Sequence, residues 1–480
     1  MFIIKIKFRN IAHFQSIILF VLIYWCLLMT VFAVENNELT KNKTKDNHSK
    51  RRAMLESKGY WIAKTLKIQY KDTESRRNRI RWWRNARFGI FVHWGVYSVL
   101  GGEYNGKDYG KEISGPSAEW IFKTAKIPKE EYRKIAKLWN PQCYNPEDWC
   151  KLAKDAGAEY IVLTAKHHDG FALFDDKGAS NWNSINSTNF KYDLLKKFVD
   201  AARQYNLKVG IYYSHRLDWW HIGLNKNTEY SDSYIKLLRS HLTTIMKNYK
   251  PDLMWFDMGR SDITADIALE ITRKYNPNCV ICGRIGGGYG DYTCLKDRQL
   301  PPPGNIIDCE TPMTMRLNWG FDKNDKNWKS SDLIIKNLSL CSTRNTNFLL
   351  NVGPQPDGRL TDEEIMRLKK IAKWMKNNSE AIKNTKVIPF INKYSWGALN
   401  VALDDKSVYM HIYEMPPNGK LVISNIDGDF TSVEYLSTHQ SLKYSYNAEK
   451  KIITIEVKPK QKGTVDIIKL ISRKAIVFDQ

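Results

Sequence analysis

The sequence lacks the short motifs of several large enzyme classes. It has no Gly-x-Ser-x-Gly nucleophile elbow, no HExxH zinc-binding helix and no phosphate-binding loop ending in Lys and Ser or Thr. The segment 286–290, GGGYG, has the glycines of a phosphate loop but not the Lys and Ser or Thr that should follow. These absences exclude the corresponding hydrolase and nucleotide chemistries, and we interpret 286–290 as a flexible active-site loop.

Acidic residues are the minority among the charged side chains. The chain has 51 Asp and Glu against 74 Lys and Arg, which gives a formal net charge of +23. A basic chain suggests nucleic acid, but the lysines are spread from end to end and no nucleic-acid-binding motif is present. We therefore expect no nucleic-acid partner. The charge favours solubility, or attraction to acidic glycans or anionic surfaces.

Metal-ligand patterns are scarce as well. The pair Cys279 and Cys282 forms a CxxC motif, but no second CxxC or His pair is spaced to complete a zinc site. Of eight cysteines, Cys26 lies in the N-terminal segment, and the remaining seven cannot all pair within one chain. The sequence therefore predicts no metal and no other cofactor, and it favours buried thiols or local disulfides.

The N-terminal segment is typical of a targeting sequence rather than of a folded domain. Basic residues precede an apolar run over 17–34, and Val31 and Ala33 form a small-residue cleavage pattern. Residues 1–33 are predicted to be a signal peptide, or an uncleaved signal-anchor because the run is long. We expect a secreted, extracellular or lysosome-like protein, with no stable membrane insertion if the leader is cleaved. Glycosylation sequons occur at Asn42, Asn47, Asn186, Asn337 and Asn377.

The middle of the chain alternates between short apolar runs and segments with helical periodicity. After a polar tether and entry segment (34–75), the apolar runs are 87–94, 159–168, 208–214, 252–258, 280–284, 305–311 and 347–354. Helical candidates between them are 146–157, 193–206, 231–249 and 262–276. This alternation predicts an α/β fold with a parallel sheet, and its length favours a (β/α)8-like (TIM-type) barrel over 76–386. An eighth strand has no clear pattern.

The pattern changes after a strong helix at 360–382. Thr361 and Glu364 form a capping box at the start of that helix. Beyond it, short alternating runs separated by turns predict a C-terminal β-sandwich over 387–480. We expect this domain to support the barrel rather than to bind glycans.

Polar residues stand at the ends of the predicted strands. Because active sites of such barrels lie where strands run into the following loops, we expect these residues to converge on one mouth. They are His93, His167, His168, Tyr213, Asp257, Arg284 and Glu310.

The residue types at this mouth suit sugar chemistry. Cleavage of a glycosidic bond needs two carboxyl groups, one protonated and one facing the anomeric carbon. Asp257, near Arg284 and the histidines, is expected to stay ionised and act as nucleophile. Glu310, in a less polar stretch, is expected to stay protonated and to act as acid/base. The 16 Trp and 25 Tyr residues also suit a pocket that stacks against sugar rings.

Seven ordered segments resemble the α-L-fucosidase family of retaining glycoside hydrolases. They are RFGIFVHWGVYSV, SAEWIF, AKHHDGFALFD, GIYYS, MWFDM, DCETPMTMRLNWGF and NFLLNVGPQPDG. The resemblance implies hydrolysis of terminal α-L-fucosyl residues of a glycan or glycoconjugate without a metal, with Asp257 as nucleophile and Glu310 as acid/base. The sugar contacts that it implies are His93, Glu119, Trp120, His167, His168, Tyr213, Trp255 and Arg284. A barrel glycosidase for another sugar and a catalytically silent fucose-binding relative remain alternatives.

Overall fold

The computed structural model describes residues 68–110, 117–224, 229–388, 394–458 and 465–479. The predicted leader of residues 1–33 lies outside the described residues, as does the tether up to residue 67. Among the helices that are described, none has both the length and the apolar character that a membrane crossing requires.

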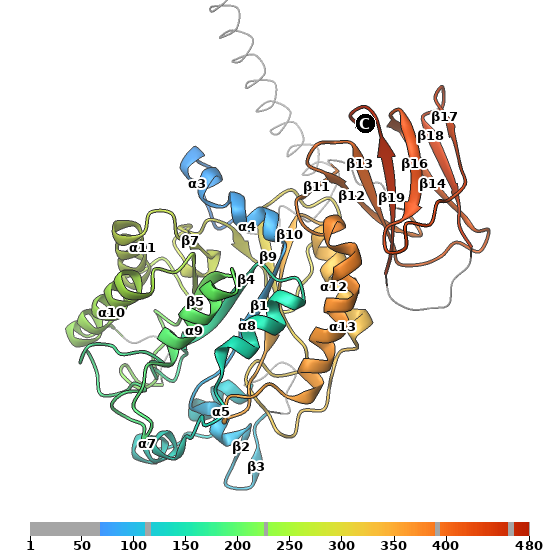
Figure 1. The fold of residues 1–480 in the computed structure, drawn as a ribbon. Coiled ribbons are helices and arrows are strands. Elements are labelled where there is room, and N and C mark those ends of the chain that lie inside the picture. Colours follow the sequence, from blue (N-terminus) through green and yellow to red (C-terminus); the bar gives the residue numbers. More distant parts are fainter. Residues whose placement is uncertain (1–67, 111–116, 225–228, 389–393, 459–464, 480) are drawn as a thin grey trace, which may run out of the picture. The chain divides into compact units, whose positions relative to one another are not determined.

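The main body is a parallel eight-stranded sheet that curls into a barrel (Figure 1). Its order is β7-β6-β5-β4-β1-β10-β9-β8, so each strand lies beside the one that precedes it in the barrel. A parallel bridge between Cys282 and Tyr292 brings the two edge strands together. The strands are β1 (Phe88–Val92), β4 (Tyr160–Lys166), β5 (Lys208–Tyr213), β6 (Leu253–Phe256), β7 (Val280–Ile281), β8 (Thr293–Cys294), β9 (Cys309–Thr314) and β10 (Thr346–Val352). The predicted TIM-type barrel is therefore confirmed.

Helices cover the outside of most of the barrel. They are α8 (Pro146–Asp155), α9 (Leu194–Gln204), α10 (Asp232–Thr244), α11 (Ile263–Tyr275), α12 (Ser331–Ser342) and α13 (Asp362–Asn378). The connections after β7 and β8 contain no α-helix; the first holds only the short turn η3 (Gly283–Ile285). These two loops are free to shape the mouth of the barrel.

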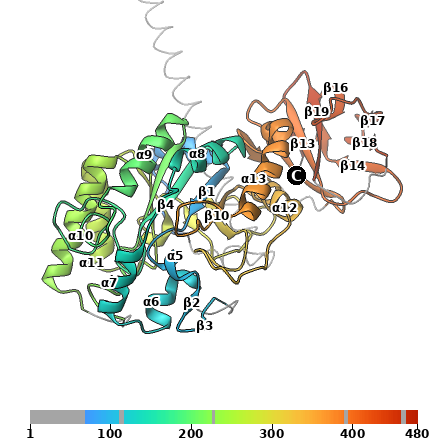
Figure 2. The same ribbon diagram turned by 60° about the horizontal axis from the view of Figure 1, so that its bottom comes forward.

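The two ends of the barrel are covered by different segments (Figures 1 and 2). Short helices α3 (Glu74–Arg79) and α4 (Arg81–Ala86) lie before β1, at the amino ends of the strands. There the Trp83 ring stacks on Tyr292 with centroids 4.1 Å apart, and Asn347 donates a hydrogen bond of 2.7 Å to the Trp83 carbonyl. The opposite, carboxyl end carries α5 (Tyr97–Leu100), β2 (Glu103–Tyr104), β3 (Lys107–Asp108), η1 (Ala118–Trp120), α6 (Ile121–Thr124) and α7 (Lys129–Leu138).

The structure adds one strand that the sequence did not place and corrects the bounds of another. The eighth strand is β8, only two residues long, which explains why the sequence shows no run for it. The run predicted at 305–311 is β9, and it begins at Cys309 and ends at Thr314. Residue 310 therefore lies near the start of its strand and not at its end.

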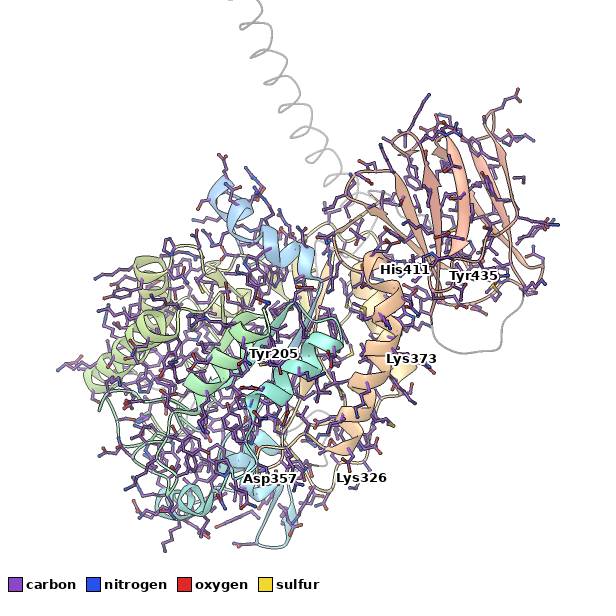
Figure 3. The ribbon with its side chains drawn as sticks, viewed as in Figure 1. Tyr205, Lys326, Asp357, Lys373, His411 and Tyr435 are labelled. Atoms are coloured by element: carbon purple, nitrogen blue, oxygen red, sulfur yellow. The ribbon has the colours of Figure 1, made fainter. Side chains whose placement is uncertain are left out.

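The C-terminal part consists of antiparallel sheets. Two of them share one core, in which Val408 and Met410 pack with Leu421 and Ile453. His411 of this part, labelled in Figure 3, accepts or donates a hydrogen bond of 2.7 Å with Ser339 of α12. The strands are β11 (Thr385–Val387), β12 (Gly397–Ala402), β13 (Ser407–Ile412), β14 (Lys420–Ser424), β15 (Ile426–Asp427), β16 (Phe430–Tyr435), β17 (Tyr444–Asn447), β18 (Ile452–Glu456), β19 (Asp466–Ser472) and β20 (Val477–Phe478).

Candidate active site

Asp257 stands directly after β6, at the carboxyl end of the barrel, as predicted. Its carboxylate accepts three hydrogen bonds, from Arg284 Nη1 at 3.2 Å, from the Tyr212 hydroxyl at 3.1 Å and from the Met258 amide at 2.8 Å. Met258 has a left-handed backbone with φ 56°, which is costly for a residue other than glycine. The backbone is therefore strained next to Asp257, whose oriented side chain is 13% exposed.

Arg284 links two carboxylates. It lies in η3 after β7, where one guanidinium nitrogen binds Asp257 and the other binds Asp297, in the loop after β8. The same nitrogen that binds Asp297 also donates to the Leu295 carbonyl at 3.0 Å, which fixes the plane of the guanidinium. The guanidinium carbon lies 5.1 Å from the centre of the Trp255 ring.

Three buried histidines form the next part of the mouth. His168 places Nε2 3.6 Å from an oxygen of Asp257. Its ring centre is 4.3 Å from that of His167, which in turn stacks on Tyr212 at 5.5 Å. The His93 ring lies 5.7 Å from His167. The structure therefore brings together the three histidines that the sequence placed at two strand ends.

Aromatic rings border these histidines. The ring of Trp120 lies 5.4 Å from His168 and 5.0 Å from Trp219, and Trp319 lies 5.1 Å from His93. Such rings provide apolar faces for the C–H surfaces of a sugar.

Glu119 is hydrogen-bonded to the segment that carries Trp319. Its carboxylate accepts a hydrogen bond of 3.0 Å from the Gly320 amide, next to Trp319. Burial raises the pKa of Glu119 to about 7. The group can therefore be neutral near physiological pH, when it can donate a hydrogen bond as well as accept one.

Tyr213 is a corrected prediction. Its hydroxyl forms a hydrogen bond of 3.0 Å with His241 of α10, so its side chain points out of the barrel. Tyr212 points inward and donates to Asp257. Because side chains alternate along a strand, Tyr212 and Tyr213 face opposite sides of the sheet. That alternation was the signal that could have identified Tyr212.

Glu310 is the second correction. It is the second residue of β9 and lies fully buried at the amino end of the barrel. Its carboxyl oxygens accept hydrogen bonds from the Tyr160 hydroxyl at 2.7 Å, from Trp255 Nε1 at 2.8 Å and from the Tyr292 hydroxyl at 2.9 Å. A proton donor in catalysis has to reach the bond that it cleaves. Burial raises the pKa of Glu310, as the sequence led us to expect, but its hydrogen bond with Trp255 places the carboxyl in the barrel interior.

Asp297 is the carboxylate that sequence reasoning missed. It follows β8 in the irregular segment between Gly283 and Gly304, and its side chain is 42% exposed. The segment shows neither helical nor strand periodicity, so its place in the fold depended on finding β8. Within the described residues, no group of three or more His, Cys, Asp or Glu side chains has an arrangement that could hold a metal ion.

A barrel mouth with an oriented carboxylate, an arginine that bridges to a second one, and aromatic walls is typical of a glycoside hydrolase. The model of the α-L-fucosidase family matches residues 54–380. The chain belongs to the α-L-fucosidase family.

Known proteins similar to this chain carry the same activity in their names. The tissue α-L-fucosidase of Bos taurus is 30% identical over 395 residues, which cover 76% of this chain and 82% of that protein. The α-L-fucosidase of Vibrio sp. strain EJY3 superimposes with a TM-score of 0.77 at 26% identity, over 85% of this chain and 74% of that one. An α-L-fucosidase of Bacteroides thetaiotaomicron, trapped as a covalent intermediate with 2-fluoro-fucosyl fluoride, gives a TM-score of 0.74 at 25% identity, over 86% and 99%.

Proposed function

We propose that this protein hydrolyses terminal α-L-fucosyl residues of glycans or glycoconjugates by double displacement, with retention of configuration. The observation that carries the proposal is the carboxylate of Asp257, held by Arg284, Tyr212 and its own neighbouring amide at the mouth of the barrel. The covalent intermediate trapped in the related Bacteroides enzyme supports a covalent route in this family.

The first step forms a bond between an Asp257 oxygen and the anomeric carbon. The bond from that carbon to the leaving oxygen breaks, and the leaving oxygen takes a proton from an acid. In the second step water attacks the same carbon, gives its proton to the conjugate base, and releases Asp257. Each displacement inverts the anomeric carbon, so the two together restore its configuration.

The second carboxyl group of this mechanism is Asp297 in our proposal, in place of the predicted Glu310. Asp257 and Asp297 bind different nitrogens of one guanidinium, so their carboxylates lie close together. Retaining enzymes need such closeness, with the two carboxyl groups about 5–5.5 Å apart. Burial raises the pKa of Asp297, but the ion pair with Arg284 outweighs this effect and the pKa lies below its usual range.

This low pKa suits the second step better than the first. Once Asp257 is esterified it no longer shares Arg284, so Asp297 remains ionised and can take the proton of the water. The first step needs protonated Asp297, and the protonated fraction grows as pH falls. We therefore expect unactivated fucosides to be cleaved fastest on the acid side of neutrality.

The nucleophile is tested with Asp257→Gly and an aryl α-L-fucoside. We expect kcat to fall by several orders of magnitude, and added azide to give the inverted β-fucosyl azide in a single displacement. The control is Asp155→Asn, a change at an exposed carboxylate in the last turn of α8, which should retain activity. Full activity of Asp257→Gly would overturn the proposal.

The acid/base group is tested by comparing Asp297→Asn with Glu310→Gln. For Asp297→Asn we expect a large loss with poor leaving groups, a small loss with a dinitrophenyl leaving group, and α-fucosyl azide in the presence of azide. For Glu310→Gln we expect equal losses for all leaving groups, with a lower melting temperature. The reverse pattern would return the acid/base role to Glu310.

The sugar is tested with a panel of aryl glycosides. A fucosidase cleaves the α-L-fucoside far faster than aryl galactosides, glucosides or rhamnosides. Faster cleavage of another glycoside would indicate a different substrate, and binding of fucose without turnover of any substrate would indicate a silent relative.

We also propose that the protein enters the secretory route through residues 1–33. The apolar run over 17–34 with basic residues before it supports this. The seven cysteines of the described residues are free thiols, and all but Cys143 are buried. Burial raises the pKa of Cys150, Cys309 and Cys341 to about 12, so these thiols are unreactive in an oxidising compartment. N-terminal sequencing of exported protein distinguishes a cleaved leader from a signal-anchor.

A further inference from the structure

The hydrogen bonds behind His168 determine which of its nitrogens carries the proton. The hydroxyl of Ser214 lies 2.6 Å from His168 Nδ1 and donates its only proton to the Leu217 carbonyl at 2.7 Å. A carbonyl can only accept, so the Ser214 oxygen must accept from the ring. His168 Nδ1 therefore carries a proton.

His93 has the same arrangement with different partners. Its Nδ1 lies 2.6 Å from the side-chain oxygen of Asn351, whose amide nitrogen donates to the Trp319 carbonyl at 2.7 Å. Turning the amide would place its oxygen against a carbonyl oxygen, so its orientation is determined. His93 Nδ1 therefore also carries a proton.

The rings of His168 and His93 each carry a single proton at neutral pH. Burial is the main cause that lowers the pKa of His168, to about 3, and the charge of Lys166 lowers it further. Burial also lowers the pKa of His93 to about 4. Each ring is neutral, and with Nδ1 protonated each Nε2 presents a lone pair.

The lone pair of His168 faces another acceptor. Its Nε2 lies 3.6 Å from Asp257 Oδ2, which accepts a hydrogen bond from the Tyr212 hydroxyl, and neither Nε2 nor Oδ2 has a proton to share when Asp257 is ionised. Tyr212 donates only to the Asp257 oxygen, so the lone pair of His168 Nε2 still needs a donor of its own. A sugar hydroxyl beside the anomeric carbon is such a donor.

We propose that Ser214 and Asn351 are positioning residues that hold His168 and His93 as Nδ1–H tautomers, so that both Nε2 atoms accept hydrogen bonds from substrate hydroxyls. This inference rests on the proposed function for the identity of the substrate. It makes the two histidines selective for hydroxyl groups, because a site with only lone pairs gains nothing from an ether oxygen or a hydrogen atom.

The first test combines Ser214→Ala with 2-, 3- and 4-deoxy aryl α-L-fucosides. In the wild type, one analogue should lose about tenfold or more in kcat/KM because His168 Nε2 is left unpaired. In Ser214→Ala the ring can take the other tautomer and donate to Asp257, so the parent substrate should lose a similar factor and that analogue little more. Additive losses for all three analogues would overturn the proposal.

The matched control is Ser184→Ala. Ser184 is buried like Ser214, but its hydroxyl has no hydrogen-bond partner among the described residues. For Ser184→Ala we expect the loss in kcat/KM from the substitution and the loss from the missing hydroxyl to add for every analogue. The variant Ser214→Thr keeps a hydroxyl and should recover the coupling that Ser214→Ala loses.

The second test does not depend on turnover. Nitrogen-15 NMR of histidine-labelled full-length protein, with His168→Gln and His93→Gln for assignment, reports which nitrogen of each ring is protonated. We expect a protonated Nδ1 and a bare Nε2 for both, with His168 alone changing in Ser214→Ala. Protonated Nε2 atoms in the wild type would overturn the proposal. Correct tautomers without fucoside cleavage would instead count against the proposed function.

Discussion

Alternation along a strand decides which of two adjacent tyrosines serves the site. Tyr212 donates to Asp257, whereas Tyr213 contacts His241 outside the barrel. We expect Tyr212→Phe to lower kcat/KM about tenfold, because the nucleophile loses one of its donors. Tyr213→Phe should leave kcat/KM within about twofold and lower stability by about 1 kcal/mol, since it removes one buried hydrogen bond. Kinetics and urea unfolding of both variants check this, and equal kinetic effects would contradict it.

The buried carboxyl group of Glu119 leads to a prediction about how the free energy of unfolding depends on pH. Burial raises its pKa from 4.5 to about 7, so the folded state binds a proton that the unfolded state releases above pH 4.5. Stability from this group is therefore complete below about pH 4.5 and is lost as pH rises to about 7. The loss is on the order of 3 kcal/mol. The difference in unfolding free energy between wild type and Glu119→Gln should follow this course, and a difference that is constant from pH 4.5 to 7 would contradict the pKa.

At the scale of elements, α13 is the helix whose start was predicted in most detail. Thr361 accepts from the Glu364 amide and Glu364 returns a hydrogen bond to the Thr361 amide, so the capping box is confirmed. Thr361→Ala should lower the unfolding free energy by about 1 kcal/mol. Lys369→Ala, at an exposed position in the same helix, is the control and should change it little. Chemical denaturation measures both, and equal effects would mean that the box contributes nothing.

Element boundaries also explain what sequence reasoning could and could not predict. β4 and β10 are buried along their whole length, and the apolar residues at their centres, 161–163 and 348–350, form the runs that identified them. β8 is two residues long and is held by pairing with β9, so it has no pattern of its own. The error in β9 had the larger consequence, because it moved Glu310 from one end of the barrel to the other.

At the scale of the whole molecule, the described part of the chain is held together by its cores and not by disulfides. All seven cysteines found there are free, although the secretory route that we propose for this chain is oxidising. We expect dithiothreitol to leave the melting temperature unchanged within about 1 °C, because no covalent cross-link constrains the unfolded chain. A fall of several degrees in reducing buffer would indicate a disulfide formed outside the arrangement described here.

The fold class, the family and the position of Asp257 could be predicted from the sequence, because apolar runs, helical periodicity and ordered motifs are local properties of the chain. Which side chains meet could be learned only from the folded arrangement of the chain. In the structure, Tyr212 and not Tyr213 contacts Asp257. Arg284 binds both Asp257 and Asp297, and Glu310 lies in the barrel interior. These outcomes depend on strand register and on loops without periodicity, and both are determined by contacts between residues far apart in the chain.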